Sequence, residues 1–188
     1  MSSSNGGFTG LMLRLIAVCA LGGLTAACFQ PMYAEQTIGG APGLKQAMAQ
    51  VDIDKVIVSN PQIDNRLGVE LYNALSWQTA GGPGQLSSPR YRLKTSVSST
   101  RVSVVVDVTT ARPELENYGI NASYELLDLA TNKIVVKDQT FSRVSYDIPG
   151  QQQRFAKARA LKDAEDRAVQ VIAEQIRNRL ASYLVART

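Results

Sequence analysis

The sequence predicts an α+β protein in which two helices pack on one face of a mostly antiparallel or mixed four-stranded sheet, in the order β-α-β-β-β-α. Residues 61–80 and 151–185 carry apolar side chains at steps of three and four, as helices with one buried face do. Residues 91–146 mostly alternate apolar and polar side chains, with the period of two that is typical of strands. Such elements form a two-layer sandwich.

The first strand and the first helix are predicted from the segment that begins at Val51. Residues 51–58 mix Val and Ile with polar residues, which favours a short strand. In the Ser-Asn-Pro sequence that follows, the side chain of Asn60 can accept hydrogen bonds from free helix amides. Pro61 at the first helical position loses only an N–H that has no partner. A helix should therefore start at Pro61, and the Gly-Gly-Pro sequence at 81–83 should end it.

In the next strand, expected over 91–110, the alternating apolar residues change from odd to even positions near Ser99-Thr100. Before this point the apolar set ends with Val97, and after it the set continues with Val102 and Val104. Because side chains in a strand change face at every residue, we predict one long strand with a bulge at Ser99-Thr100 that turns Val102 and Val104 inward.

Residues 118–126 show the clearest alternation in the chain, and a second strand is expected over 134–146. Turn-forming residues at 131–133 separate them, so an antiparallel hairpin is predicted. The helix over 151–185 has an Ala-rich inner face and a charged outer face, which we interpret as a solvated surface rather than a membrane-binding one.

The N-terminal residues indicate export. The apolar run 15–24 follows Arg14 and is shorter than the roughly 20 residues of a membrane-spanning helix. It leads to Thr-Ala-Ala-Cys, which is typical of a bacterial lipoprotein precursor, although Thr25 stands where such sequences usually carry Leu. We predict a signal peptide over 1–27, an acylated Cys28 in a lipidated tether over 28–50, and one domain over 51–188. An ordinary secretory peptide cut after an Ala-x-Ala-like site is the alternative.

Composition limits the function further. Removal of residues 1–27 leaves 161 residues with 19 Lys and Arg against 16 Asp and Glu, which is too mildly basic for a protein built mainly to bind nucleic acid. The chain has no His, so the usual general base and the commonest metal ligand are both missing. No GxSxG or SxxK motif and no glycine-rich phosphate loop is present. We therefore expect a protein that is not an enzyme and that carries no metal or cofactor apart from the acyl groups on Cys28.

Several features together resemble the LPS-assembly lipoprotein LptE family of Gram-negative outer membranes. They are the signal sequence, the Cys28-Phe-Gln-Pro-Met-Tyr33 opening, the element order, the Tyr-Arg-Leu-Lys sequence at 91–94, the expected loop at 111–113 and the Ala-rich last helix. The likeness covers nearly the whole chain.

The resemblance implies a domain anchored through Cys28 to the periplasmic leaflet of the outer membrane and seated in the lumen of a large LptD-like β-barrel. There it would plug the barrel, assist its assembly and bind lipopolysaccharide (LPS) for delivery to the outer leaflet. Phe29 follows the cysteine in place of the Asp that commonly signals inner-membrane retention, which favours the outer membrane. The alternative function is a periplasm-facing accessory lipoprotein of a lipid or solute transporter without a barrel partner.

LPS is polyanionic, so its binding would use Lys and Arg donors. The candidates lie in the expected sheet and its loops and are Lys94, Arg101, Arg112, Lys137 and Arg143. The resemblance places Arg112 in the loop between the second and third strands and Lys137 near a basic residue of the last strand. For each candidate the alternative role is to keep an exposed strand edge soluble.

Overall fold

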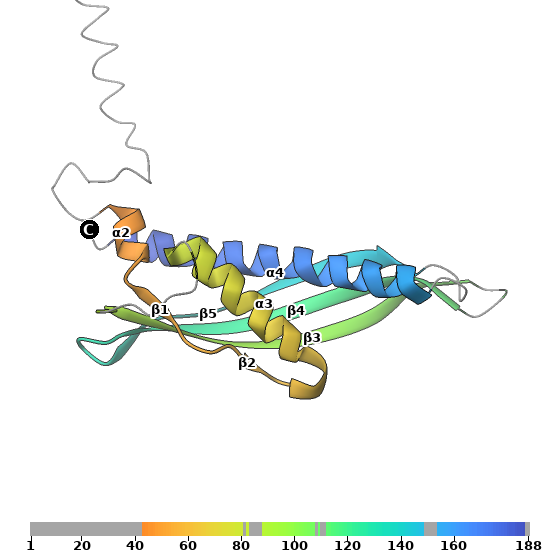
Figure 1. Cartoon of the computed structure of the whole chain (residues 1–188), viewed down its shortest axis with the longest axis horizontal. Helices are drawn as coiled ribbons and strands as arrows, with labels where there is room; N and C mark the ends of the chain where they lie inside the picture. The colour runs from red at the N-terminus through yellow and green to blue at the C-terminus, as the bar shows by residue number, and fades with distance from the viewer. Residues whose placement is uncertain are drawn as a thin grey trace, which may run out of the picture. The chain divides into compact units, whose positions relative to one another are not determined.

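The computed structural model describes residues 43–80, 82, 88–107, 109, 112–148 and 154–186. The predicted signal peptide, Cys28 and most of the predicted tether lie outside these residues. The helices and strands are α2 (Leu44–Met48), β1 (Val51–Ile53), β2 (Ile57–Val58), α3 (Pro61–Ala80), β3 (Tyr91–Asp107), β4 (Arg112–Asp128), β5 (Lys133–Asp147) and α4 (Arg154–Val185). Helices α3 and α4 lie on one side of a long sheet (Figure 1), which confirms the predicted two-layer α+β class.

The sheet is mixed. Its described strands follow the order β1-β3-β4-β5, and β2 also pairs with β3. Both β1 and β2 run parallel to β3, whereas β3–β4 and β4–β5 are antiparallel. The strand predicted over 51–58 is thus two short strands along one edge of β3. Between them, Val56 is buried and the Asp54 N–H donates a hydrogen bond to the Leu93 carbonyl at 2.9 Å, so the segment stays attached to β3.

The predicted hairpin at the other side of the sheet is confirmed. The β4–β5 turn places Asn132 at φ 54°, a left-handed conformation that Asn tolerates well. The side chain of Asp128 holds the turn, because its Oδ1 accepts hydrogen bonds from the N–H groups of Ala130 at 2.9 Å and Thr131 at 3.3 Å. Local turn chemistry therefore fixes where these strands reverse.

The predicted bulge at Ser99-Thr100 is wrong in position. The β3–β4 register is regular from Tyr91 through Ser103 and shifts only at the Ser103/Val105 and Val105/Val106 steps. Val102 consequently stays on the face that carries no helices, where it is 58% exposed, and Val104, which lies inside the first register shift, is 50% exposed. The inward position at the predicted bulge is instead polar: Ser99 donates a hydrogen bond at 2.5 Å to the buried carboxylate of Asp64 on α3. At Val102, the change from odd to even apolar positions therefore reflects an apolar residue on the open face and not a bulge, and the irregularity in the strand comes later, between Ser103 and Val106.

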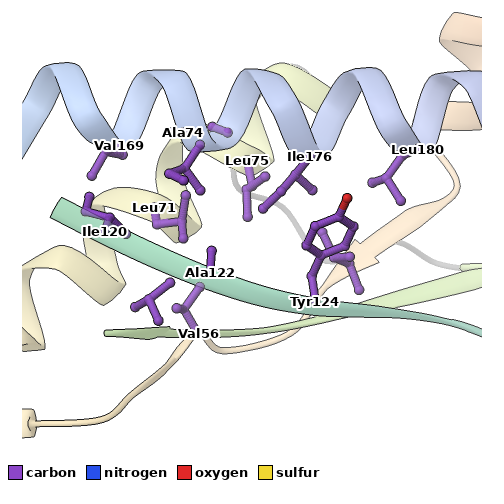
Figure 2. Close-up of a cluster of buried hydrophobic side chains, with 14 of the residues drawn as sticks. Val56, Leu71, Ala74, Leu75, Ile120, Ala122, Tyr124, Val169, Ile176 and Leu180 are labelled. Carbon is purple, nitrogen blue, oxygen red and sulfur yellow. The ribbon is translucent and has the colours of Figure 1, made fainter. Parts of the chain in front are cut away.

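Helix α3 begins at Pro61 as predicted. The Gln62 N–H donates to Asn60 Oδ1 at 3.3 Å, and the helix ends at Ala80 before the Gly-Gly-Pro sequence. Between α3, α4 and the sheet lies the core, part of which Figure 2 shows. Its fully buried side chains include Leu71 and Leu75 of α3, Ile176 and Leu180 of α4, and Ile120 of β4.

Alanines let the long helix α4 approach the sheet closely. Ala164, Ala168, Ala173 and Ala181 are all at most 1% exposed, as an Ala-rich inner face predicts. No helix within the described ranges is both long enough and apolar enough to be a candidate membrane span.

The end of the predicted tether belongs to the folded domain. Residues 44–48 form α2, and its Leu44, Ala47 and Met48 are part of the core cluster. This helix was not predicted because five residues are too few to show a helical period. The folded part therefore starts before Val51, where the sequence placed its boundary.

Candidate functional site on the open face of the sheet

The sheet has one covered and one open face, and the pairing register assigns each side chain to one of them. Leu93, Leu126 and Val136 are aligned across β3, β4 and β5 and are buried under the helices. One residue further along, Lys94, Glu125 and Lys137 are aligned on the opposite face, and no described helix covers them. The open face is the surface on which the sheet can meet a ligand or a partner.

Most of the open face is built from small polar side chains. Successive cross-strand rows on β3, β4 and β5 are Ser96–Ser123–Gln139, Ser98–Asn121–Phe141, Thr100–Gly119–Arg143 and Val102–Asn117–Ser145. In the last of these rows, the Ser145 hydroxyl donates to Asn117 Oδ1 at 2.6 Å. Hydroxyl and amide groups in regular rows give this face many hydrogen-bond donors and acceptors with little steric bulk.

A basic row, which we define as Lys94, Glu125 and Lys137, lies at one end of these polar rows. Lys137 Nζ is 2.7 Å from Glu125 Oε1, and this hydrogen bond raises the pKa of Lys137 above its ordinary value of 10.5. No ion pair of Lys94 is found among the described residues. Adjacent strands are about 4.8 Å apart, so the two lysines are separated by about 10 Å at their Cα atoms. The row presents two cations against one anion.

A shallow hollow with a volume of about 550 Å³ adjoins the basic row. Its walls include Lys94, Glu125 and Lys137, the small polar residue Ser123 of the neighbouring row, and Ile57 of β2. Ile57 is 66% exposed, which is unusual for a large aliphatic side chain. The hollow thus joins two ammonium groups to an exposed apolar side chain.

Arg143 occupies a second position on the open face. Its guanidinium lies 5.9 Å from the centre of the Phe141 ring, within the range of a cation–π contact. In the same row, Gly119 leaves room for Thr100, because a Cβ there would be only 2.8 Å from Thr100 Oγ1, whereas its distance of 3.7 Å to Arg143 Cγ would be an ordinary van der Waals contact. Six residues of β4 separate this row from the basic row, or about 20 Å, so Arg143 is not part of the same cluster.

The structure separates the other two predicted candidates from the basic row. Arg101 is aligned with buried Tyr118 and hence lies on the same face of the sheet as the helices, but its side chain is exposed. Burial raises the pKa of Tyr118, and the nearby Arg101 opposes that rise. Arg112 does not lie in a loop, because it is the first residue of β4 and pairs with Asp107. The side chain of Arg112 is outside the described part of the chain.

Sequence reasoning identified Lys94 and Lys137 but missed Glu125 and Ile57. Neither missed residue stands out in the sequence unless the pairing of the strands is known. Glu125 is a polar position in the strand predicted over 118–126, and Ile57 is an apolar residue in the strand predicted over 51–58. Pairing across the four strands β2, β3, β4 and β5 brings them to the two lysines. No group of three or more His, Cys, Asp or Glu residues within the described segments is arranged to hold a metal ion.

Comparison with known proteins finds a similar fold among solved bacterial structures. No protein-family model and no curated protein matches the chain. A solved structure from Caulobacter crescentus, named as a candidate lipoprotein, has a TM-score of 0.57 and 22% identity, and the alignment covers 76% of this chain and 96% of that one. A protein from Xanthomonas campestris has a TM-score of 0.50 and 12% identity, with coverages of 74% and 88%.

Rare lipoprotein B from Shewanella oneidensis also appears among the similar structures, with a TM-score of 0.48, 14% identity and coverages of 72% and 98%. At these identities, the likeness to the Caulobacter and Xanthomonas structures shows the fold alone. The chain thus has a two-layer fold that is also found in a protein named as a bacterial lipoprotein.

Proposed function

We propose that this chain is an outer-membrane lipoprotein of the LPS transport and assembly machinery, anchored through Cys28 and working with a large LptD-like β-barrel. In this proposal it plugs the barrel, assists its assembly and binds LPS on the open face of the sheet. The role is binding and not catalysis. Support for the anchor comes from the Thr-Ala-Ala-Cys sequence and from the fold shared with a structure named as a lipoprotein.

The observation that carries the LPS part of the proposal is the basic row. Lys94 and Lys137 present two ammonium groups from Cα atoms about 10 Å apart, which suits a ligand with more than one phosphate. The adjoining rows of Ser, Asn and Gln suit a ligand rich in hydroxyl groups. A sugar backbone bearing phosphates has both kinds of group.

The first experiment tests the basic row. The double variant Lys94→Glu/Lys137→Glu should bind LPS more weakly than the unmodified chain, and added salt should weaken binding of the unmodified chain, since the charges are exposed. The matched control is Lys133→Glu/Lys157→Glu, which makes the same charge change at two exposed lysines outside the row. Equal LPS binding by both double variants and the unmodified chain would contradict the assignment of the basic row.

The second experiment tests the partner and the anchor. Membranes solubilised in mild detergent should yield an equimolar large β-barrel when this protein is pulled down, and Cys28→Ala should abolish incorporation of labelled palmitate. Recovery of the protein without a barrel would favour the accessory-transporter function instead. Persistent palmitate labelling of the Cys28→Ala variant would contradict the anchor.

A further inference from the structure

A second cavity lies beside the basic row, on the other side of Ile57. It is a groove of about 730 Å³ between the β1–β2 segment and helix α3. Its apolar walls include Ile53, Val56, Ile57, Val69 and Tyr72. This volume and this predominance of apolar walls are those of sites that hold small apolar ligands, whose volumes run from about 300 to 1,000 Å³.

The packing of α3 against β2 gives the groove its shape. Gly68 of α3 faces Val58 of β2 so closely that a Cβ on the glycine would be 2.8 Å from Val58 Cγ1. Helix α3 and strand β2 are therefore in close contact at Gly68 and Val58. Val69, the residue after Gly68, is left 55% exposed beside this contact. The polar residues of the groove are Asp54, Lys55 and Asn65. The backbone N–H of Lys55 donates to Asp54 Oδ1 at 2.8 Å.

Ile57 connects the two cavities, because it lines both the groove and the hollow of the basic row. It is aligned with Ser96 of β3, and Lys94 lies two residues before Ser96 in that strand on the same face. Diagonal neighbours of this kind are about 7–8 Å apart at their Cα atoms. A cationic surface and an apolar groove thus meet at one residue.

We infer that the groove receives the acyl chain of an anionic amphiphile whose phosphate lies on the basic row. Charge complementarity identifies the occupant: a ligand that fills both cavities has a negative head for Lys94 and Lys137 and an apolar chain that passes Ile57 into the groove. This inference rests on the proposed function, since the same two lysines hold the head. It adds that the protein recognises the acyl part of the lipid as well as its phosphates.

Photo-crosslinking tests the inference on the full chain in a mild non-ionic detergent. The probe is a lysophosphatidic acid of 12 carbons with a diazirine at the end of its acyl chain, and the labelled peptides are identified by mass spectrometry. Labelling should concentrate in peptides that contain residues 53–58 or 61–72. A phosphatidylcholine probe with the same chain should label less, because its head carries no net charge.

Val69→Gln and Ile57→Gln should each reduce this labelling by about fourfold or more, the cost of leaving one CH₂ group unburied. The matched control is Val171→Gln on α4, which changes another exposed valine away from the groove. Urea midpoints equal to that of the unmodified chain establish that the variants fold. Labelling outside the groove, or labelling unaffected by both groove variants, would overturn the inference. Groove labelling that survives Lys94→Glu/Lys137→Glu unchanged would instead overturn the proposed phosphate site.

Discussion

Gly68 provides a test of the contact between α3 and β2. In an exposed helix interior, Gly→Ala stabilises a protein by about 0.8–1.0 kcal/mol. Gly68 is buried, however, and the new Cβ would be 2.8 Å from Val58 Cγ1. Valine is stiff at χ1, so its methyl group cannot turn away freely, and overpacking of this kind costs about 1–3 kcal/mol. We therefore expect Gly68→Ala to lower the free energy of unfolding by about 1 kcal/mol.

A double-mutant cycle separates the two contributions. Val58→Ala removes the methyl group that the new Cβ would meet, so in this background Gly68→Ala should stabilise the protein by about 1 kcal/mol. The coupling energy between the two positions would then be about 2 kcal/mol. Urea unfolding at equilibrium measures all four species, and unchanged m-values would show that the unfolded state is the same in each.

The sign of the change in the free energy of unfolding that Gly68→Ala causes decides whether this reasoning holds. If Gly68→Ala stabilises the protein as much with Val58 present as with Val58→Ala, the two residues are not in contact and the groove does not have the shape described above. A thermal scan gives an independent reading, because about 1 kcal/mol corresponds to about 2–4 °C in Tm for a domain of this size.

Three further predictions concern the site, the helix pair and the core. Glu125→Gln should strengthen LPS binding, because it frees Lys137 from its ion pair; weaker binding in a direct titration would mean that Glu125 is needed to position Lys137. Burial raises the pKa of Glu70 above its ordinary 4.5, against the opposing charge of Arg66 and with Asp166 and Lys162 also nearby. The folded state then binds the Glu70 proton more tightly than the unfolded state. The stabilisation of the folded state by this proton is therefore present below about pH 4.5 and is lost as pH rises through the pKa of Glu70 in the folded state. Glu70→Gln should flatten that fall in urea midpoints measured from about pH 4 to 7, and an unchanged slope would exclude Glu70 as its source. Ile176→Ala, at a fully buried position, should cost about 2–5 kcal/mol, whereas Val171→Ala on the exposed face of the same helix should stay within about 0.5 kcal/mol; similar losses in the two would contradict the orientation of α4.

Much of the fold follows from local chemistry. The start of α3 at Pro61 depends on the Asn60 side chain and on the missing N–H of proline, both of which the sequence shows directly. The β4–β5 reversal depends on residues such as Asn132, whose φ of 54° suits the turn. Such signals involve neighbours in the chain, so they can be predicted without knowing what packs against them.

The misplaced bulge shows where local patterns fail. Val102 and Val104 were expected to point inward because they are apolar, yet Val102 lies on the open face and Val104 is 50% exposed at a register shift. Alternation shows that a strand has two faces, but burial depends on what covers each face. On the covered side, Ser99 is accommodated because Asp64 of α3 accepts its hydrogen bond. That partner is 35 residues away in the chain.

The sequence by itself determined the α+β class, the order of the main elements, the limits of α3, the end of α4 and the hairpin turn, because these depend on periodicity and on turn and cap residues. It also pointed to Lys94 and Lys137 as basic residues of the sheet. Only the tertiary structure decided that these two lysines flank Glu125, that Arg143 stands about 20 Å away, and that Ile57 joins the hollow to the groove. The reason is register: strand pairing joins residues far apart in the chain, and a period of two is equally compatible with many registers.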